Sequence, residues 1–437
     1  NRWGYFPSVA AGWRVSEEAF LKDRVQWLSN LKLRGSWGQI GNDKIGNDKY
    51  RALANISPSY DAVFGGVFYP GGTITSLSNR SVHWERSEQM DLGFDLGLLN
   101  NRFSLELDYY RRDTKDMLVT VDVPASVGLT PVETNVGAVR NSGVDFTVKW
   151  EDSLKDFQYG IRLTGTTIKN EVISLGGKRI ASGDIGAGKS VQMTEEGKPI
   201  KYFYGYNVIG IFQNEAQIKE YNERAAAATG NSGQQYQNNV GPGDLIYEDV
   251  DGDGYITAND RKDLGSPTPK FIGGLGISAS WKGFDLSMVW AGAAGFSIYW
   301  GATTGYNAAS TEWGSTIAQR VAENHYFYNP ENPDDPRTNI NAKYPRMAYI
   351  DGYVQNRHGN TTLWLYKGDY IKLKNLSLGY TLPKNWVSKI AMQNARIYVS
   401  AENLLTITGF EGQDPESATG MGYSPFRTIA IGANITF

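Results

Sequence analysis

The C-terminal stretch from Thr428 to Phe437 alternates strictly between apolar and small or polar side chains, and it ends on an aromatic residue. Side chains alternate between the two faces of a strand, so the apolar set Ile429, Ile431, Ala433, Ile435 and Phe437 shares one face. A transmembrane barrel accounts for both faces, with lipid outside, a wet lumen inside and an aromatic girdle at the interface. The stretch therefore predicts a membrane-spanning strand.

Composition permits this interpretation although the chain is polar overall. Its 437 residues carry a net charge of −3 and contain no cysteine, and the mean hydropathy is −0.41. No run of about 18 apolar residues is present that could form a transmembrane helix. A barrel tolerates low hydropathy because only alternate residues face lipid. The charge gives no indication of nucleic acid as a partner.

The stretch from Glu88 to Tyr110 predicts a hairpin with one apolar and one acidic face. Apolar residues recur at every second position on both sides of a short turn at 99–102. The apolar row is Met90, Leu92, Phe94, Leu96, Leu98, Phe103, Leu105, Leu107 and Tyr109. The carboxylates Glu88, Asp91, Asp95, Glu106 and Asp108 are expected to face a water-filled lumen rather than to form an acid–base pair.

Similar alternation recurs along the chain and predicts about 12–14 strands. Short turns alternate with long connections at about residues 168–200, 212–270 and 296–362. The predicted fold class is all-β: a transmembrane antiparallel β-barrel with short periplasmic turns and long extracellular loops. A soluble sandwich or propeller is the alternative, but no repeat of about 40–50 residues supports a propeller.

An ordered set of motifs resembles the SusC/RagA family. The set comprises Phe6–Arg14, Leu31–Gly38 with Gly41-Asn42, Trp84-Glu85, Tyr109-Tyr110 with Thr114, Asp116–Leu118, Asn135–Gly137, Asn141–Gly143, Tyr370–Tyr380, Ser400–Thr406, Asp414-Pro415 and the terminal Phe437. The resemblance implies that residues 1–437 are the C-terminal portion of a TonB-dependent receptor β-barrel of about 22 strands. The N-terminal plug and the first strands of that barrel are expected to lie outside this chain.

The resemblance also implies a function and partners. It implies an importer in the outer membrane of a Gram-negative bacterium that takes up oligosaccharides or oligopeptides and has no enzymatic activity. The implied partners are a SusD-like lipoprotein lid, the TonB complex reached through the missing N-terminal region, and outer-membrane lipid. The sequence begins at Asn1, with no initiator methionine and no signal peptide, so we expect further residues upstream in the natural protein. We expect Phe437 to be the natural end, on a strand that pairs with the first strand of the barrel.

The segment Asp249–Asp260 has the spacing of a twelve-residue calcium loop. The predicted ligands are Asp249, Asp251, Asp253, the Tyr255 carbonyl, Thr257 and Asp260, with calcium favoured over magnesium. Asp260 stands where such loops usually have a bidentate glutamate, and Gly254 permits the sharp turn. The alternative is an acidic turn that binds no metal.

The sequence predicts no catalytic site and no organic cofactor. The three histidines, His83, His325 and His358, are far apart, and cysteine is absent. The stretch Gly183–Ser190 fits the spacing of a phosphate-binding loop, but it has no parallel strand and helix around it.

Aromatic residues are dense in the long connections and are candidates for ligand or lid contact. The candidates are Tyr202, Tyr204, Tyr206, Tyr299, Trp300, Trp313, Tyr326 and Tyr328. Aromatic faces stack on sugar rings and anchor protein interfaces, but they also form loop cores. Two other functions stay open at this point: an outer-membrane adhesin or structural barrel without transport, and a soluble carbohydrate-active all-β protein.

Overall fold

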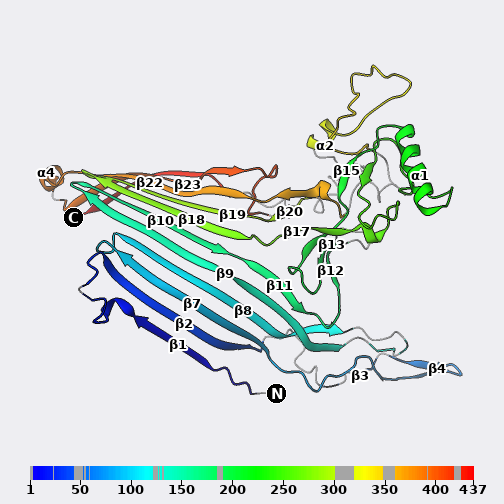
Figure 1. Cartoon of the computed structure of the whole chain (residues 1–437), viewed down its shortest axis with the longest axis horizontal. Helices are drawn as coiled ribbons and strands as arrows, with labels where there is room; N and C mark the ends of the chain where they lie inside the picture. Colours follow the sequence, from blue (N-terminus) through cyan, green and yellow to red (C-terminus); the bar gives the residue numbers. More distant parts are fainter. Residues whose placement is uncertain are drawn as a thin grey trace.

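One large antiparallel sheet, here called the wall, dominates the computed structural model (Figure 1). The wall has 12 strands in the order β1-β2-β7-β8-β9-β10-β18-β19-β22-β23-β24, with β11 pairing alongside β9. The structure describes residues 3–22, 24–43, 53, 56–58, 60–121, 126, 128–129, 132–184, 190–300, 319–347, 360–390, 392–417 and 425–437. The expected fold class of antiparallel barrel strands is confirmed.

The wall strands are long, and most connect to a sequence neighbour. They are β1 (Ser8–Arg14), β2 (Leu28–Asn42), β7 (Glu85–Leu98), β8 (Phe103–Val121), β9 (Val132–Leu154), β10 (Phe157–Thr167), β11 (Lys169–Ser174), β18 (Phe271–Trp281), β19 (Phe284–Ala294), β22 (Tyr370–Thr381), β23 (Asn394–Thr408) and β24 (Thr428–Thr436). The described residues contain no helix that is long and apolar enough to cross a membrane.

The strand register aligns the apolar rows that the sequence predicts. Leu33 lies opposite Phe94, Phe94 opposite Leu107, and Leu107 opposite Phe146, so one apolar row crosses four strands. Cross-strand pairs of this kind are the unit of sheet stabilisation. Leu92, on the same face as Phe94, is 53% exposed. This outward face therefore presents apolar side chains to its surroundings.

A β-bulge lies in β22 between Leu373 and Leu376. The apolar residues occupy odd positions before the bulge and even positions after it, yet all of them lie on the outward face. Leu376 lies opposite Met288 and Leu373 lies opposite Trp290, with the register shift between them. The extra residue of a bulge shifts the side-chain parity by one, so Leu373 and Leu376 both join the outward row.

Short turns join neighbouring strands at one end of the wall, here called the turn end. The two-residue turn Lys282-Gly283 has φ of 45° and 89° and connects β18 to β19. Positive φ at both central residues fits the primed hairpin turns, whose twist matches that of the strands. The α4 segment (Lys384–Val387) and Phe437 lie at the same end (Figure 1).

Long connections lie at the opposite end, here called the loop end. The expected loops 168–200 and 212–270 are parts of a single connection from β10 to β18. Its first residues form β11 and continue the wall beside β9, because Lys169 to Ser174 pair with Ser142 to Ala138. A further long connection from β2 to β7 includes the pairs β3 (Ile56–Ser57) with β6 (Thr73–Ile74), and β4 (Ala62–Phe64) with β5 (Val67–Tyr69).

The connections β10–β18 and β19–β22 fold into a structured unit, here called the loop body (Figure 1). Its strands are β12 (Ile180–Asp184), β13 (Ser190–Thr194), β14 (Tyr202–Gly205) and β17 (Lys262–Gly265) in one sheet, then β15 (Val208–Ile211) with β16 (Leu245–Tyr247), and β20 (Ser297–Tyr299) with β21 (Leu365–Lys367). Its helices are α1 (Glu215–Thr229) and α2 (Gln319–Glu323).

Local signals explain where helix α1 begins and ends. The Asn214 side chain accepts a hydrogen bond from the Gln217 amide at 2.9 Å, which caps the first turn. Gly230 follows the helix with φ of 68°, a left-handed conformation that costs glycine little. Ile218 and Ala225 pack with Phe212 in a buried cluster. Most of the large side chains that are fully buried lie in the loop body rather than in the wall.

Candidate functional site

The two long connections are held together by hydrogen bonds in the loop body. The Tyr206 amide donates to the Asn360 carbonyl at 2.8 Å, and the Arg346 amide donates to the Gly243 carbonyl at 2.8 Å. The Tyr326 hydroxyl donates to the Gln213 carbonyl at 2.6 Å. These contacts join segments more than a hundred residues apart, so the loop body is a single unit.

A buried ion pair strengthens this junction. The Arg346 guanidinium donates to both carboxylate oxygens of Asp244, at 2.9 and 3.1 Å. The Asp244 side chain is fully buried, and it also accepts a hydrogen bond from the Gly241 amide at 2.7 Å. A buried carboxylate requires such compensation because desolvation of a charge is costly.

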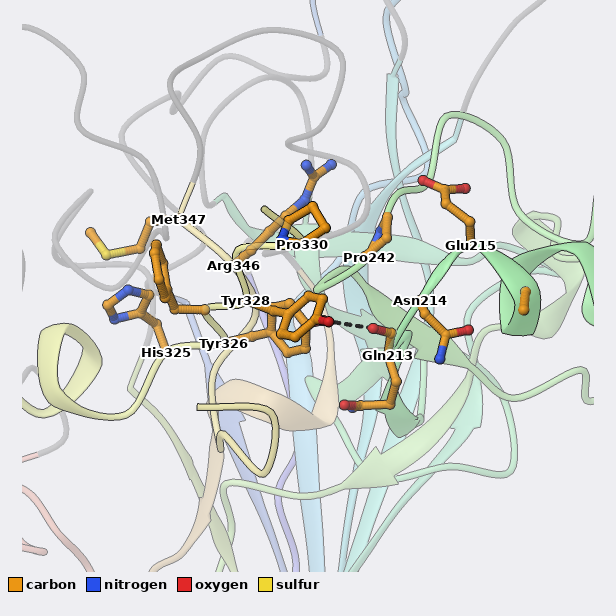
Figure 2. Close-up of a pocket in the computed structure, with 12 residues that line it drawn as sticks. Gln213, Asn214, Glu215, Pro242, His325, Tyr326, Tyr328, Pro330, Arg346 and Met347 are labelled. Atoms are coloured by element: carbon orange, nitrogen blue, oxygen red, sulfur yellow. Dashed lines mark hydrogen bonds between the residues drawn. The ribbon is translucent and has the colours of Figure 1, made fainter. Parts of the chain in front are cut away.

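A pocket of about 630 Å³ lies beside this junction (Figure 2). The lining residues are Gln213, Asn214, Glu215, Ala216, Pro242, His325, Tyr326, Phe327, Tyr328, Pro330, Arg346 and Met347. Aromatic and apolar groups with a few polar atoms are typical of ligand pockets. The volume suits part of an oligomeric ligand, and Glu215, His325 and Arg346 add ionisable groups to the aromatic and apolar lining.

The aromatic candidates divide between the loop-body interior and this pocket. Tyr202 is 1% exposed, Tyr326 is 3% exposed, and Tyr328 is 41% exposed. Only Tyr326 and Tyr328 of the described candidates line the pocket. The others pack in the loop body: Tyr202 against Tyr204, Tyr206 against Tyr247, and Tyr299 and Trp300 against buried clusters. Trp313 lies outside the described residues.

The buried tyrosines serve as neutral hydrogen-bond donors. Burial and the hydrogen bond to Glu195 raise the pKa of Tyr202 above its ordinary value. Burial also raises the pKa of Tyr326. Both phenols therefore remain protonated at neutral pH and offer no general base.

Stacked cations and aromatic rings form a second arrangement that sequence patterns did not reveal. Arg179 lies 5.1 Å from the Tyr204 ring centre, and Arg261 lies 5.7 Å from that of Tyr206. Arg179 also pairs with Glu195 at 2.6 Å. Cation–π contacts of this kind brace the β12-β13-β14-β17 sheet.

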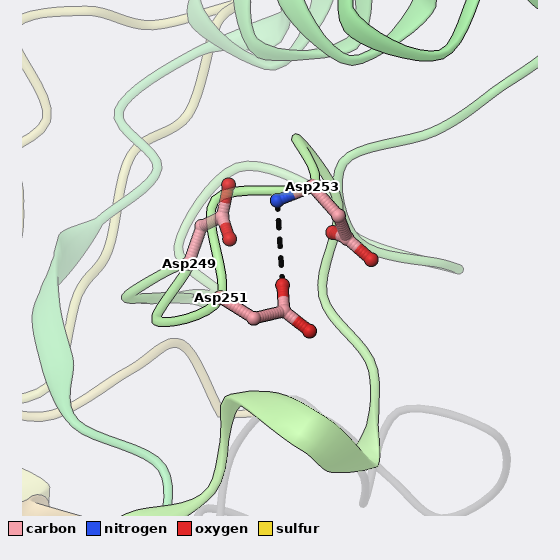
Figure 3. Close-up of side chains that lie close together, drawn as sticks. All are labelled: Asp249, Asp251 and Asp253. Carbon is pink, nitrogen blue, oxygen red and sulfur yellow. Dashed lines mark hydrogen bonds between the residues drawn. The ribbon is translucent and has the colours of Figure 1, made fainter.

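The acidic loop brings three of its predicted ligands together (Figure 3). Carboxylate oxygens of Asp249, Asp251 and Asp253 lie within 4.8 Å of one another. The two Asp249 oxygens accept from the amides of Gly252 and Gly254, at 2.7 and 2.9 Å. Desolvation and, to a smaller extent, the neighbouring carboxylates raise the pKa of Asp251.

The remaining predicted ligands shape the end of the loop. Asp260 is fully buried, and its oxygens accept from the amides of Val250 at 2.8 Å and Thr257 at 2.7 Å. The Thr257 hydroxyl caps the following turn by accepting from the Asn259 amide at 3.0 Å. Tyr255 packs its ring on the cluster beneath helix α1. The donor set of hard oxygen atoms fits calcium chemistry.

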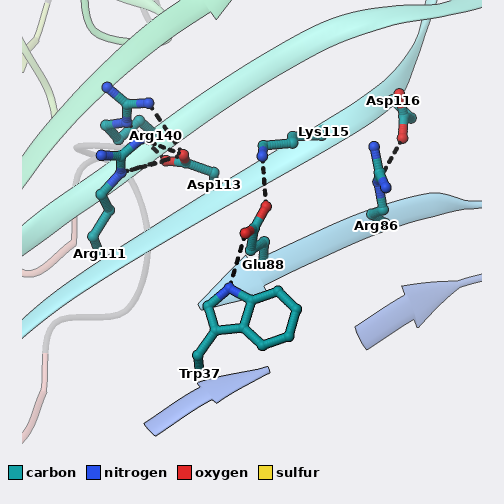
Figure 4. A network of polar contacts seen from close by, with 8 residues as sticks. All are labelled: Trp37, Arg86, Glu88, Arg111, Asp113, Lys115, Asp116 and Arg140. Atoms are coloured by element: carbon teal, nitrogen blue, oxygen red, sulfur yellow. Dashed lines mark hydrogen bonds and ion pairs between the residues drawn. The ribbon is translucent and has the colours of Figure 1, made fainter. Parts of the chain in front are cut away.

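The inward face of the wall carries the lumen carboxylates, with one exception. Arg34 pairs with Asp95 at 2.9 Å and with Asp108 at 2.7 Å. Glu88 instead shares the outward row with Met90, because no register shift separates them on β7. It accepts from the Trp37 indole at 2.9 Å and pairs with Lys115, also at the loop end (Figure 4). The expectation of a lumen position for Glu88 was therefore wrong.

Paired charges continue the outward row toward the loop end, since Arg111 lies opposite Met90 and Asp113 lies opposite Glu88 and Arg140 (Figure 4). Asp113 lies between Arg111 and Arg140, each at 2.8 Å. Arg86 pairs with Asp116 at 2.9 Å. The apolar outward row thus gives way to compensated charge where the strands approach the long connections.

Comparison with known proteins assigns the family. Residues 1–404 match the family described as TonB dependent receptor-like, beta-barrel. The chain belongs to this family, within its SusC/RagA group. This TonB-dependent receptor barrel is 32% identical over 457 residues to TonB-dependent receptor P3 of Formosa agariphila, covering 100% of this chain and 42% of the relative. It is 26% identical to TonB-dependent receptor SusC of Bacteroides thetaiotaomicron, covering 100% of this chain and 40% of SusC.

Solved structures share the fold. The RagAB peptide importer in the open-open state superposes with a TM-score of 0.74 at 24% identity, covering 100% of this chain and 43% of that chain. The closed-closed state gives 0.71 at 24% identity, covering 98% and 43%. The chain spans about two fifths of the length of the curated relatives it matches.

Family membership settles three expectations. The chain is part of a TonB-dependent receptor barrel of the outer membrane of a Gram-negative bacterium. The family consists of transporters rather than enzymes, which confirms the expectation of no enzymatic activity. Short turns face the periplasm in such barrels and long loops face outward, so the turn end is periplasmic and the loop body is extracellular.

Proposed function

We propose that this chain forms the wall and outer mouth of a TonB-dependent importer for oligosaccharides or oligopeptides. The observation that carries the proposal is the loop body, which holds a pocket of about 630 Å³ at the extracellular end of a wall with a polar inward face. A pocket there captures a ligand outside the membrane. The chain then contributes binding and guidance, and no bond is made or broken.

The remaining parts of the importer are proposed from the same family. We propose that a plug within the lumen and a contact with the TonB complex are supplied by a part of the receptor outside this chain. Two solved structures with the same fold are described as a RagAB peptide transporter and a RagAB peptide importer. This supports a SusD-like lipoprotein lid, and the exposed rim of the loop body is the surface available to it. Ile209 and Tyr328 are exposed there.

Tyr328 is the pocket residue best suited to test ligand capture. Its ring is 41% exposed and lines the pocket, whereas Tyr326 also holds the loop body together through Gln213. The test expresses the full-length gene in a strain that lacks it and measures uptake of labelled oligopeptides and oligosaccharides. Tyr328→Ala is expected to lower uptake of the transported class about tenfold, the loss of one well-placed aromatic contact.

Tyr60→Ala is the matched control, since Tyr60 is an exposed tyrosine of another connection that does not line this pocket. Uptake should be unchanged by it. Binding of either ligand class to the cell surface without accumulation would instead favour an adhesin. Accumulation of neither class, with a lid protein that fails to co-purify, would contradict the importer proposal.

We also propose that the acidic loop binds calcium. Asp249, Asp251 and Asp253 would hold the ion with the Tyr255 carbonyl, and Thr257 would complete the site directly or through water. Asp260 would contribute only if one of its oxygens binds the ion while keeping its amide partners. The ion would neutralise the repulsion among the three carboxylates and fix the loop against helix α1.

Calorimetry of the full-length protein tests this proposal. Calcium should produce a binding heat in the wild type, and Asp251→Ala should abolish it. Asp334→Ala removes an exposed carboxylate of the other long connection and should leave the heat unchanged. Absence of any calcium heat in the chelator-treated wild type would show that the loop is an acidic turn without metal.

A further inference from the structure

Three lysines at the turn end lack any carboxylate within ion-pair distance in the described part of the chain. They are Lys282 in the β18–β19 turn, and Lys384 and Lys389 in the segment between β22 and β23. All three are exposed. Their only described charge or ring contact is that of Lys282, whose ammonium lies 5.4 Å from the centre of the Trp281 ring.

Backbone hydrogen bonds bring the two lysine-bearing segments side by side. The Thr381 amide donates to the Gly283 carbonyl at 2.7 Å, so the β18–β19 turn lies against the end of β22. The segment then folds back, because the Trp386 amide donates to the Pro383 carbonyl at 2.9 Å. The Gln393 amide donates to the Thr436 carbonyl at 2.8 Å, which fixes the return beside β24. The segment is thus held on both sides (Figure 1).

Exposed aromatic rings surround these lysines. Trp281, Phe284, Trp386 and Phe437 are each at least half exposed. Trp281 and Phe284 lie opposite each other at the end of the outward apolar row, and Phe284 packs on Tyr380 with ring centres 4.5 Å apart. In outer-membrane barrels such rings mark the membrane–water interface. The lysines therefore lie at the level of lipid headgroups.

The charge of this patch is compensated only in part: the α-carboxylate of Phe437 lies at the same end, but in the described part of the chain it forms no ion pair with the three lysines. Lys155 in the neighbouring β9–β10 turn is next to Asp156 in the sequence, so that turn adds no net charge to the patch. Asp285, the next carboxylate on β19, pairs with Arg396 at 2.5 Å and lies on the opposite face from Phe284. The outward charges of the loop end, by contrast, are paired with one another (Figure 4). The three lysines therefore leave an excess of positive charge at the turn end.

We propose that Lys282, Lys384 and Lys389 bind the phosphate headgroup of an anionic phospholipid in the periplasmic leaflet. The ammonium groups supply point charges and hydrogen-bond donors to the phosphate, and the Trp281 and Trp386 rings pack at the glycerol level. A free phosphate would lack the apolar contact that these rings offer. The proposal rests on the outer-membrane barrel alone and is independent of what the protein transports.

Native mass spectrometry of the full-length protein in detergent tests the proposal. Phosphatidylglycerol, whose headgroup is anionic, and phosphatidylcholine, whose headgroup is zwitterionic, are titrated separately with the same acyl chains. The wild type should bind phosphatidylglycerol more tightly, by about fivefold for each lysine engaged. The triple variant Lys282→Ala, Lys384→Ala, Lys389→Ala should lose more than tenfold of this preference.

Two further variants make the result specific. The control variant removes three charges from exposed lysines of the loop body: Lys201→Ala, Lys219→Ala and Lys367→Ala. It should keep the preference for phosphatidylglycerol. Replacement of the three turn-end lysines by arginine should keep it, because the charge stays. Heat-modifiable gel migration checks that each variant is folded.

Three outcomes would overturn the proposal. They are equal binding of the two lipids by the wild type, a preference that survives in the folded triple-alanine variant, and an equal loss in the loop-body control. The last outcome would mean that net charge, rather than this patch, attracts the lipid.

Discussion

A single buried carboxylate, Asp244, shows how one residue can hold two distant segments of this protein together. It is fully buried, and Arg346 is its bidentate partner. If Arg346 is replaced by an uncharged residue, the buried carboxylate of Asp244 loses the guanidinium that compensates its charge. The cost of breaking such a pair is about 3–5 kcal/mol, much more than an exposed pair contributes.

We therefore expect Arg346→Met to loosen the loop body while the wall stays folded. Hydrogen exchange measured by mass spectrometry should show faster exchange in peptides that cover 206–248 and 325–346. Lys219→Ala breaks an exposed pair with Glu223 and should change exchange by little. Unchanged exchange in the Arg346 variant would mean that other contacts carry the junction.

At the scale of the strand, the alternating pattern assigns each residue of β7 to one of the two faces of the wall. Leu92 and Phe94 belong to the outward row, and Asp95 faces inward, where it pairs with Arg34. A shift of one residue would exchange the two faces completely. The assignment of faces is therefore testable one residue at a time.

Spin labels at Leu92, Phe94 and Asp95 of the full-length protein in lipid provide the measurement. Oxygen should relax the labels at Leu92 and Phe94 more strongly, because oxygen concentrates in lipid. A water-soluble relaxing agent should act more strongly at Asp95. Equal accessibility at all three positions would refute the register.

The wall could be predicted from sequence because its signal is local. Alternation of apolar and polar residues can be recognised within about ten residues of a strand. The dipeptide Lys282-Gly283 between two such strands predicts a two-residue hairpin turn. Helix α1 also has local signals, Asn214 before it and Gly230 after it, although the alternation gives no hint of it.

The loop body could not be predicted in the same way. Its junction joins Asp244 to Arg346, which are 102 residues apart, and Tyr206 to Thr362. Nothing in either segment alone specifies the other. The pocket beside the junction has the same origin, so Tyr326 and Tyr328 could be proposed from composition, but Arg346 could not.

At the scale of the whole molecule, the described wall ends in two strands with an unpaired side. β1 pairs only with β2, and β24 pairs only with β23, within the residues that the structure describes. Unpaired backbone groups are not tolerated in lipid, so both edges need partner strands. We propose that these partners belong to the rest of the receptor, whose relatives are more than twice as long.

Production of residues 1–437 alone should therefore fail to give an inserted barrel, whereas the full-length protein should give one. Heat-modifiable migration after refolding in detergent, together with protease resistance of the wall, distinguishes the two outcomes. A heat-modifiable, protease-resistant species from residues 1–437 would show that the sheet closes on itself or pairs with a second copy.

The four strands that carry the loop body, β10, β18, β19 and β22, are consecutive in the sheet. The whole unit is consequently mounted on one short arc of the barrel rim, with no attachment to the strands from β1 to β8 by chain connection. The connection that begins this unit also contacts β8, because the Lys178 ammonium donates to the Thr120 carbonyl and Val119 packs against Val172 and Leu175. The unit is therefore anchored along an arc that runs from β8 to β22, so a change in twist among these neighbouring strands would carry the pocket with it.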